Sequence, residues 1–71
     1  MDAQLVRDRV EEIRVKGVVD GDDEVAHSME DELYLDVLKM VARGVVTTAT
    51  AIECAAEALK AQDLDFARWC A

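Results

Sequence analysis

Proline is absent from this chain of 71 residues, and glycine occurs only three times, at Gly17, Gly21 and Gly44. Because proline interrupts helices and strands from within, its absence leaves long stretches in which regular structure can continue. The glycines are therefore the main candidates for turns, since glycine readily adopts the left-handed conformation that follows many helix ends. Gly17 and Gly44 each follow a helical pattern, so we expect them to divide the chain into three segments.

Several functional classes lack the residues that they require. No apolar run approaches the roughly 20 residues of a membrane span, and residues 1–6 lack the apolar stretch of a secretory signal, so we expect a cytoplasmic protein. Only 8 Lys and Arg stand against 16 Asp and Glu, which argues against nucleic acid or an anionic membrane as partner. Cys54 and Cys70 are too few for a disulfide scaffold and form no CxxC motif, so we expect reduced thiols.

Negative charge is abundant, and it is confined to one segment. The formal net charge is −8, and residues 20–36 account for all of it because acidic and basic residues balance on either side. The segment has no Lys or Arg, contains the only histidine, His27, and carries these carboxylates: Asp20, Asp22, Asp23, Glu24, Glu30, Asp31, Glu32 and Asp36. A charge imbalance of this kind can steer the approach of a partner of opposite charge.

The length fits one domain, residues 1–71, and a hydrophobic fraction of 52% favours a packed core over disorder. A domain this small buries only about 60% of its unfolded surface, so its stability margin is thin. Self-association or a bound partner would widen that margin. We therefore expect the chain to be able to form homo-oligomers.

Helical spacing dominates the first two segments. Residues 2–16 place Ala3, Val6, Val10 and Ile13 on one face, with Asp2 suited to the N-cap. Residues 22–43 place a narrow polar stripe of Glu32, Asp36, Lys39 and Arg43 opposite a wide apolar arc. That arc comprises Met29, Leu33, Val37, Met40 and Val41, widened by Tyr34, Leu38 and Ala42. A helix with so little polar surface should be covered on several sides, so we expect it to be the centre of the core.

The third segment follows Gly44. Thr50 and Glu53 have the spacing of a capping box, although Thr47 or Thr48 could begin the helix earlier. The face predicted to be buried comprises Ala49, Ile52, Ala56 and Leu59. Asp63 or Asp65 could then cap a short final helix with Leu64, Phe66 and Trp69. No strand pattern competes, so the predicted fold class is all-α: a small three-helix domain with a short C-terminal helical turn.

The candidate functional residues share one face of the second predicted helix. Asp23, His27, Glu30 and Tyr34 follow one another at steps of four, three and four, and Asp31 lies one turn from His27. Glu30 points in the direction of the apolar arc, and a core-facing carboxylate must be paired, hydrogen-bonded or neutralised. An arginine of the first helix (Arg7, Arg9 or Arg14) could supply the partner, and His27–Asp31 fits an ordinary surface pair.

Two chemical alternatives remain open for these residues. An acid and an imidazole at matching pitch could exchange protons, but no nucleophile, oxyanion donor or second histidine accompanies them, so we expect no enzymatic activity. His27 and Glu30 also have a metal-ligand spacing, which a di-metal bundle would need twice and which a homodimer could supply. Trp69 would be a natural anchor for a partner if it is exposed.

The stretches DDEVAHSMEDELYLDVLKMVARG (residues 22–44) and ALKAQDLDFARWCA (residues 58–71) resemble a family of very small uncharacterised proteins of actinobacteriophages and actinobacteria. The resemblance covers about half of the chain and implies no assigned activity or cofactor. Small phage proteins of this kind often bind host proteins and modulate them, which is an argument from association alone.

These observations lead to one functional hypothesis and one alternative. The first is a non-enzymatic protein-binding module without cofactors, a phage factor that acts on a host protein through an acidic, partly apolar surface. Its predicted partner-binding residues are Asp22, Asp23, Glu24, His27, Glu30, Asp31, Tyr34 and Trp69. The alternative is a helical protein that binds a metal or small ligand through the acidic and histidine cluster of the second helix.

Overall fold

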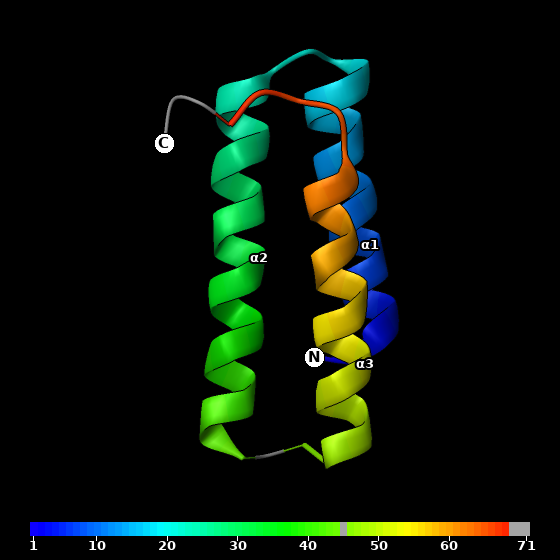
Figure 1. The fold of residues 1–71 in the computed structure, drawn as a ribbon, viewed down its shortest axis with the longest axis vertical. Coiled ribbons are helices and arrows are strands. Elements are labelled where there is room, and N and C mark those ends of the chain that lie inside the picture. The colour runs from blue at the N-terminus through cyan, green and yellow to red at the C-terminus, as the bar shows by residue number, and fades with distance from the viewer. Residues whose placement is uncertain (45, 69–71) are drawn as a thin grey trace.

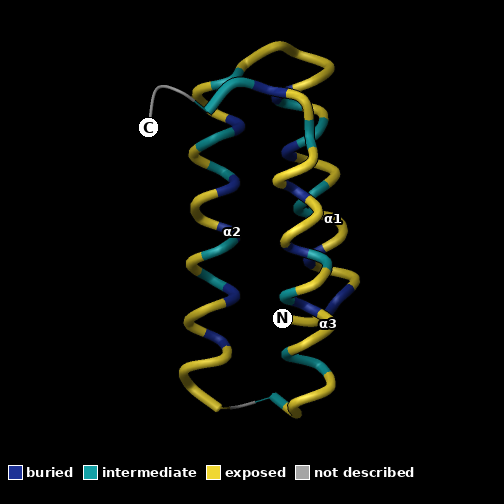
Figure 2. Tube along the Cα trace, viewed as in Figure 1, coloured by how far each residue is buried: buried dark blue, intermediate teal, exposed yellow. Residues whose placement is uncertain are grey.

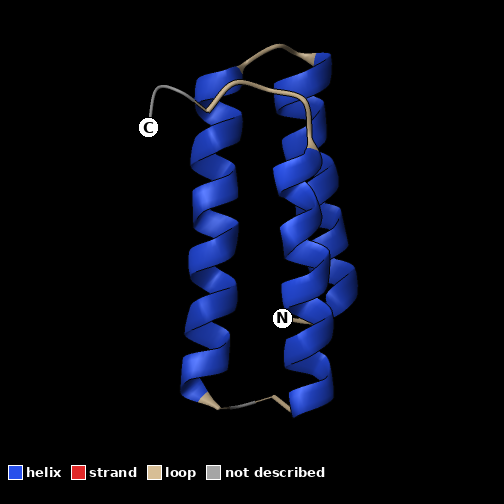
Figure 3. Ribbon diagram, viewed as in Figure 1, coloured by secondary structure: helices blue, strands red, loops and turns tan. Residues whose placement is uncertain are grey.

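The computed structural model describes residues 1–44 and 46–68 of the chain. Its elements are the helix α1 (Ala3–Arg14), the π-helical turn η1 (Val15–Val19), the helices α2 (Asp23–Arg43) and α3 (Thr48–Leu59), and the 3-10 turn η2 (Lys60–Asp63). Figure 1 shows α1 and α3 side by side and α2 standing opposite both, and the chain after η2 crosses back to the N-terminal end of α2. The described residues contain no strand (Figure 3), so the all-α prediction is confirmed. The 3-10 turn η2 lies before the residues predicted for the final turn.

The first helix begins as predicted and ends later. The side chain of Asp2 accepts a hydrogen bond from the backbone N–H of Leu5, and Ala3, Val6 and Ile13 are buried. The prediction that Gly17 follows the helix end was wrong, because η1 continues the helix through Val19. The chain turns instead at Gly21, whose φ of 70° lies in the left-handed region.

Close packing explains why position 17 is a glycine. A Cβ atom built at Gly17 would lie 2.8 Å from two ring carbons of Phe66 and 3.0 Å from the Cβ of Ala26. Phe66 is buried and belongs to the apolar core. The chain leaves helical geometry at Leu64, which is extended, so the predicted final helix through Phe66 is wrong. Trp69, its last member, lies outside the described residues.

The second helix has the predicted bounds but less cover than we expected. Asp22 caps its first turn by accepting a hydrogen bond from the N–H of Val25, and Gly44 ends it with a φ of 66°. Its buried positions face α1 and α3, whereas its outer side is exposed (Figure 2). The prediction that other helices cover α2 on several sides was wrong, since Leu35, Leu38 and Val41 all lie exposed on its surface.

The third helix packs through a face other than the predicted one. Thr47 is the N-cap, which was one of the starts that the sequence allowed. The predicted inner residues (Ala49, Ile52, Ala56 and Leu59) are exposed, and Cys54 and Ala58 are buried instead. This segment is apolar almost all round, so its periodicity could not decide between faces, and small side chains on the chosen face let the neighbouring helices approach closely.

Ion pairs tie α1 to both other helices around a small apolar core. Arg9 donates to Asp36 of α2 at 2.8 Å, and Arg7 lies 3.3 Å from Glu57 of α3. Lys60 also contacts Glu57 at 2.8 Å, and its hydrogen bond is the main reason that the pKa of this carboxyl is lowered. The buried cluster that these pairs surround comprises Val6, Ile13, Ala26, Leu33, Val37, Met40, Cys54, Ala58, Ala61 and Phe66.

Candidate functional site

The first turn of α2 concentrates acidic side chains at the positive end of the helix dipole. Asp22 is the N-cap, and Asp23 and Glu24 lie in the first turn. Carboxylates at these positions stabilise a helix through capping and through the dipole. Of the predicted site residues, these three therefore have a structural role, while Asp22 and Glu24 remain exposed to solvent.

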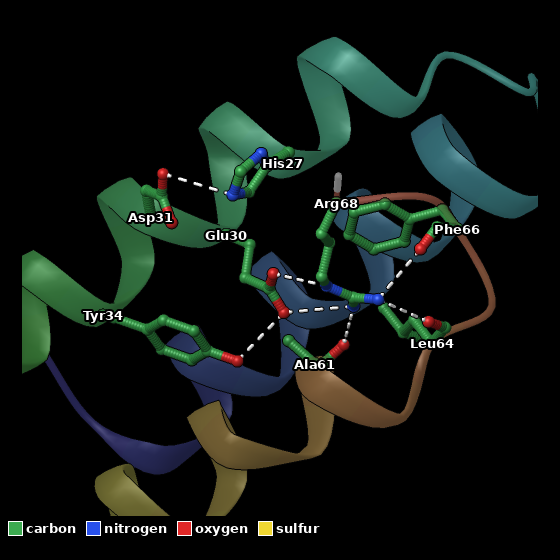
Figure 4. Close-up of polar contacts among 8 residues, drawn as sticks. All are labelled: His27, Glu30, Asp31, Tyr34, Ala61, Leu64, Phe66 and Arg68. Atoms are coloured by element: carbon green, nitrogen blue, oxygen red, sulfur yellow. Dashed lines mark hydrogen bonds and ion pairs between the residues drawn. The ribbon is translucent and has the colours of Figure 1, made fainter. Parts of the chain in front are cut away.

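Glu30 is the one carboxylate of the acidic segment that is directed into the protein, as its position on the helix predicted. It is 3% exposed. Arg68 donates from Nε to one of its oxygens at 2.8 Å and from a terminal nitrogen to the other at 3.2 Å. The hydroxyl of Tyr34 donates to that second oxygen at 2.9 Å. Figure 4 shows the carboxylate held between the guanidinium and the phenol. A buried carboxylate bonded in this way is satisfied on both oxygens.

Arg68 uses its remaining donors to fold the C-terminal segment around itself. Its terminal nitrogens donate to the backbone carbonyls of Ala61 at 2.7 Å, Leu64 at 3.0 Å and Phe66 at 3.0 Å. The guanidinium carbon lies 3.8 Å from the centre of the Phe66 ring, which is within cation–π distance. The hydrogen bond to Glu30 is the main cause that raises the pKa of Arg68. We call Glu30, Tyr34 and Arg68 the C-terminal clasp.

The arginine that pairs with Glu30 comes from the C-terminal segment and not, as predicted, from the first helix. The three arginines of α1 bind other acids: Arg7 pairs with Glu57, Arg9 with Asp36, and Arg14 with Glu11. Arg68 was not among the predicted partners of Glu30, because the two residues lie 38 positions apart in the chain. The only available signal was the general one that an inward-facing carboxylate requires a cation or several hydrogen-bond donors.

The clasp changes the acid–base behaviour of Tyr34. Burial raises the pKa of its hydroxyl to about 12, and the hydrogen bond to the Glu30 carboxylate contributes in the same direction. A phenol in this position stays protonated and donates its hydrogen bond across the whole physiological range. It therefore acts as a structural donor.

His27 and Asp31 form the predicted pair, with 3.5 Å between Nε2 and a carboxylate oxygen. The imidazole side chain is 14% exposed and the Asp31 carboxylate 68% exposed, so the pair joins a largely covered ring to a solvated acid. Within residues 1–44 and 46–68, no three His, Cys, Asp or Glu side chains converge as ligands of a metal would. Cys54 is buried as a free thiol in the core, whereas Cys70 and Trp69 lie outside the described residues.

One row of side chains along α2 is polar in the first half of the helix and apolar in the second half. Asp23, His27 and Asp31 occupy its first half, and Tyr34 and Leu38 continue the row at helical spacing. This strip therefore joins four predicted site residues to Leu38, and it is polar at the N-terminal end of α2 and apolar beyond it.

Comparison with known proteins gives no match: no family model, no curated protein and no solved structure is significantly similar to this chain. In the described part of the chain, no helix combines the length and the apolar character needed to cross a membrane.

Proposed function

We propose that this protein is a non-enzymatic protein-binding module. In this proposal, the carboxylates of the first half of α2 attract a basic partner, and apolar side chains of its second half provide affinity. The observation that carries the proposal is the outer side of α2, which displays both kinds of group to solvent. Its exposed carboxylates include Glu24, Asp31 and Glu32, and its exposed apolar residues include Leu38 and Val41.

The charges of the surrounding helices strengthen this interpretation. Outside residues 20–36 acidic and basic residues balance, so the net charge of −8 belongs to the segment that begins α2. Of the three exposed acids above, none has an ion pair with a Lys or Arg among the described residues. Uncompensated carboxylates raise the encounter rate with a basic surface, and apolar area then determines how long the complex lasts.

The clasp favours a binding role over an enzymatic one. Glu30, the acid that we considered for proton transfer, is held by Arg68 and Tyr34, and His27 pairs with Asp31. A general acid or base must reach a substrate, whereas Glu30 is buried and already bonded on both oxygens. We therefore assign Glu30 to stability and the exposed acids to recognition.

The proposal extends to the source of the partner. The resemblance of residues 22–44 and 58–71 to small actinobacteriophage proteins supports a protein of an actinobacterial host as the target. The chemistry of α2 requires that this target presents basic side chains next to an apolar surface.

The test is affinity capture from an actinobacterial host lysate with two charge variants as bait. The first variant combines Glu24→Gln, Asp31→Asn and Glu32→Gln, which removes three exposed charges from α2. We expect it to lose a partner that the wild-type protein retains, and we expect capture by the wild-type protein to weaken as salt is added, because salt screens exposed charges.

The matched control removes three exposed carboxylates elsewhere, through Glu53→Gln, Asp63→Asn and Asp65→Asn. Both variants have the same net charge, so the control should keep the partner if the position of the acids matters. Equal loss from both variants, or no salt-sensitive partner with any bait, would contradict the proposal. Circular dichroism of each variant establishes that the helical fold is retained.

A further inference from the structure

An apolar groove runs between α2 and α3. Its lining consists of Tyr34, Val37 and Leu38 from α2 and Ala55, Ala58 and Leu59 from α3. Val37 and Ala58 are buried and form its floor, whereas Leu38 is 65% exposed and Leu59 is 53% exposed, so they form its two rims. None of the lining residues carries a charge. Such a groove suits the apolar face of a helix, which presents side chains at every third or fourth position.

The charge at one end of the groove selects its occupant. Asp31 lies three residues before Tyr34 on α2, and Asp23 and His27 continue this row towards the start of the helix. An occupant that lies over Leu38 therefore reaches the exposed carboxylate of Asp31 two turns along the same row, beside the C-terminal segment whose Arg68 neutralises Glu30. A second copy of this chain also carries a net charge of −8, so repulsion opposes self-association through this face. A cationic helix is attracted instead.

We propose that the groove between α2 and α3 binds an amphipathic helix of another protein, with leucine-like side chains between Leu38 and Leu59 and a Lys or Arg facing Asp31. This inference rests on the proposed function and specifies where the partner binds and what chemistry it has. The two rim leucines would carry most of the affinity, because apolar anchors that lose water on binding dominate helix-in-groove complexes.

The structure supplies matched controls for both rims. Leu35 is 51% exposed on α2 and Ile52 is 65% exposed on α3, and neither lines the groove. Substituting each by serine removes a similar exposed apolar side chain from the same helix. Two comparisons separate binding in the groove from unspecific hydrophobic binding: Leu38→Ser with Leu35→Ser, and Leu59→Ser with Ile52→Ser.

The probe is a fluorescein-labelled synthetic helical peptide with leucines along one face and lysines on the other, titrated by fluorescence anisotropy. We expect the wild-type protein to bind this peptide. Leu38→Ser and Leu59→Ser should each raise the Kd about tenfold or more, because each removes one buried apolar anchor. Leu35→Ser and Ile52→Ser should stay within about twofold of wild type, since solvent-exposed positions outside an interface contribute little. Asp31→Asn should weaken binding and reduce its salt dependence.

Several outcomes overturn this inference. Equal effects of Leu38→Ser and Leu35→Ser would show that the peptide does not bind specifically in the groove. Binding of a matched peptide with glutamates in place of lysines would remove the charge argument. A concentration-dependent dimer that Leu38→Ser disrupts would make a second copy the occupant. If the groove variants behave as wild type while the acidic variants still lose the lysate partner, the groove assignment fails and the proposed function stands.

Discussion

Removing Arg68 should destabilise this protein strongly, because it leaves the buried carboxylate of Glu30 without its cation. Arg68→Met keeps an unbranched apolar stem but deletes both hydrogen bonds to Glu30, which is 3% exposed. Breaking a buried ion pair by removing one partner costs about 3–5 kcal/mol. The side chain of Arg68 is 29% exposed, so water can approach the vacated site, and we expect the lower end, about 3 kcal/mol.

That loss is large for a chain of 71 residues, since domains of this length have total stabilities of roughly 4–11 kcal/mol. Urea denaturation followed by far-ultraviolet circular dichroism measures it as a lower midpoint at unchanged slope. Glu30→Leu alone should cost less, about 1–2 kcal/mol, because Arg68 keeps its bonds to backbone carbonyls and part of its hydration. The double variant removes the stranded charge, so we expect a coupling energy of about 2 kcal/mol between the two positions.

This double-mutant cycle tests directly whether Glu30 and Arg68 interact in the folded protein. If Arg68→Met costs less than about 1 kcal/mol, the pair behaves as a surface ion pair and Glu30 is not buried beneath the C-terminal segment. Additive effects of the two substitutions would show that the residues do not share one interaction. Arg14→Met provides the control, because Arg14 pairs with Glu11 at the exposed surface of α1.

Other parts of the structure give further tests. The pKa of Tyr34 is about 12 in the folded protein, above the value of about 10 for an unfolded chain, so its stabilising contribution is complete below pH 10 and is lost as the pH rises towards 12. Between pH 9 and pH 11.5, the free energy of unfolding measured by urea denaturation should therefore fall by about 1 kcal/mol more for the wild-type protein than for Tyr34→Phe, after allowance for solvent screening. Equal falls would contradict this. Gly17→Ala should cost about 1–2 kcal/mol in thermal melts despite the better helix propensity of alanine, because its Cβ meets the Phe66 ring. A Phe66→Ala background should reduce this cost and leave only the contact with Ala26. Cys54 is fully buried, so in a Cys70→Ser variant the thiol should react with a disulfide reagent only at the rate at which the protein opens, and fast labelling without urea would show that the core is accessible.

Local sequence signals predicted the helices and their ends well wherever the interaction spans a few residues. Asp2 and Asp22 cap their helices, and Gly44 ends α2 in the left-handed conformation. The inward direction of Glu30 also followed from spacing alone, because residues three and four apart share one face. The prediction that a helix ends at Gly17 was wrong, because this position is a glycine for the sake of tertiary packing against Phe66, which a helix-end pattern does not contain.

Local patterns in the amino-acid sequence specify three helices, their caps and one carboxylate that must be neutralised inside the protein. The packing of distant segments specifies that Arg68 neutralises it, that Cys54 lies on the buried face of α3, and that the outer side of α2 stays open. The two sets of features differ because they depend on interactions over different distances along the chain. Capping and helical periodicity act over one or two turns, whereas the choice among arginines, and among the faces of an alanine-rich helix, depends on which segments meet in space.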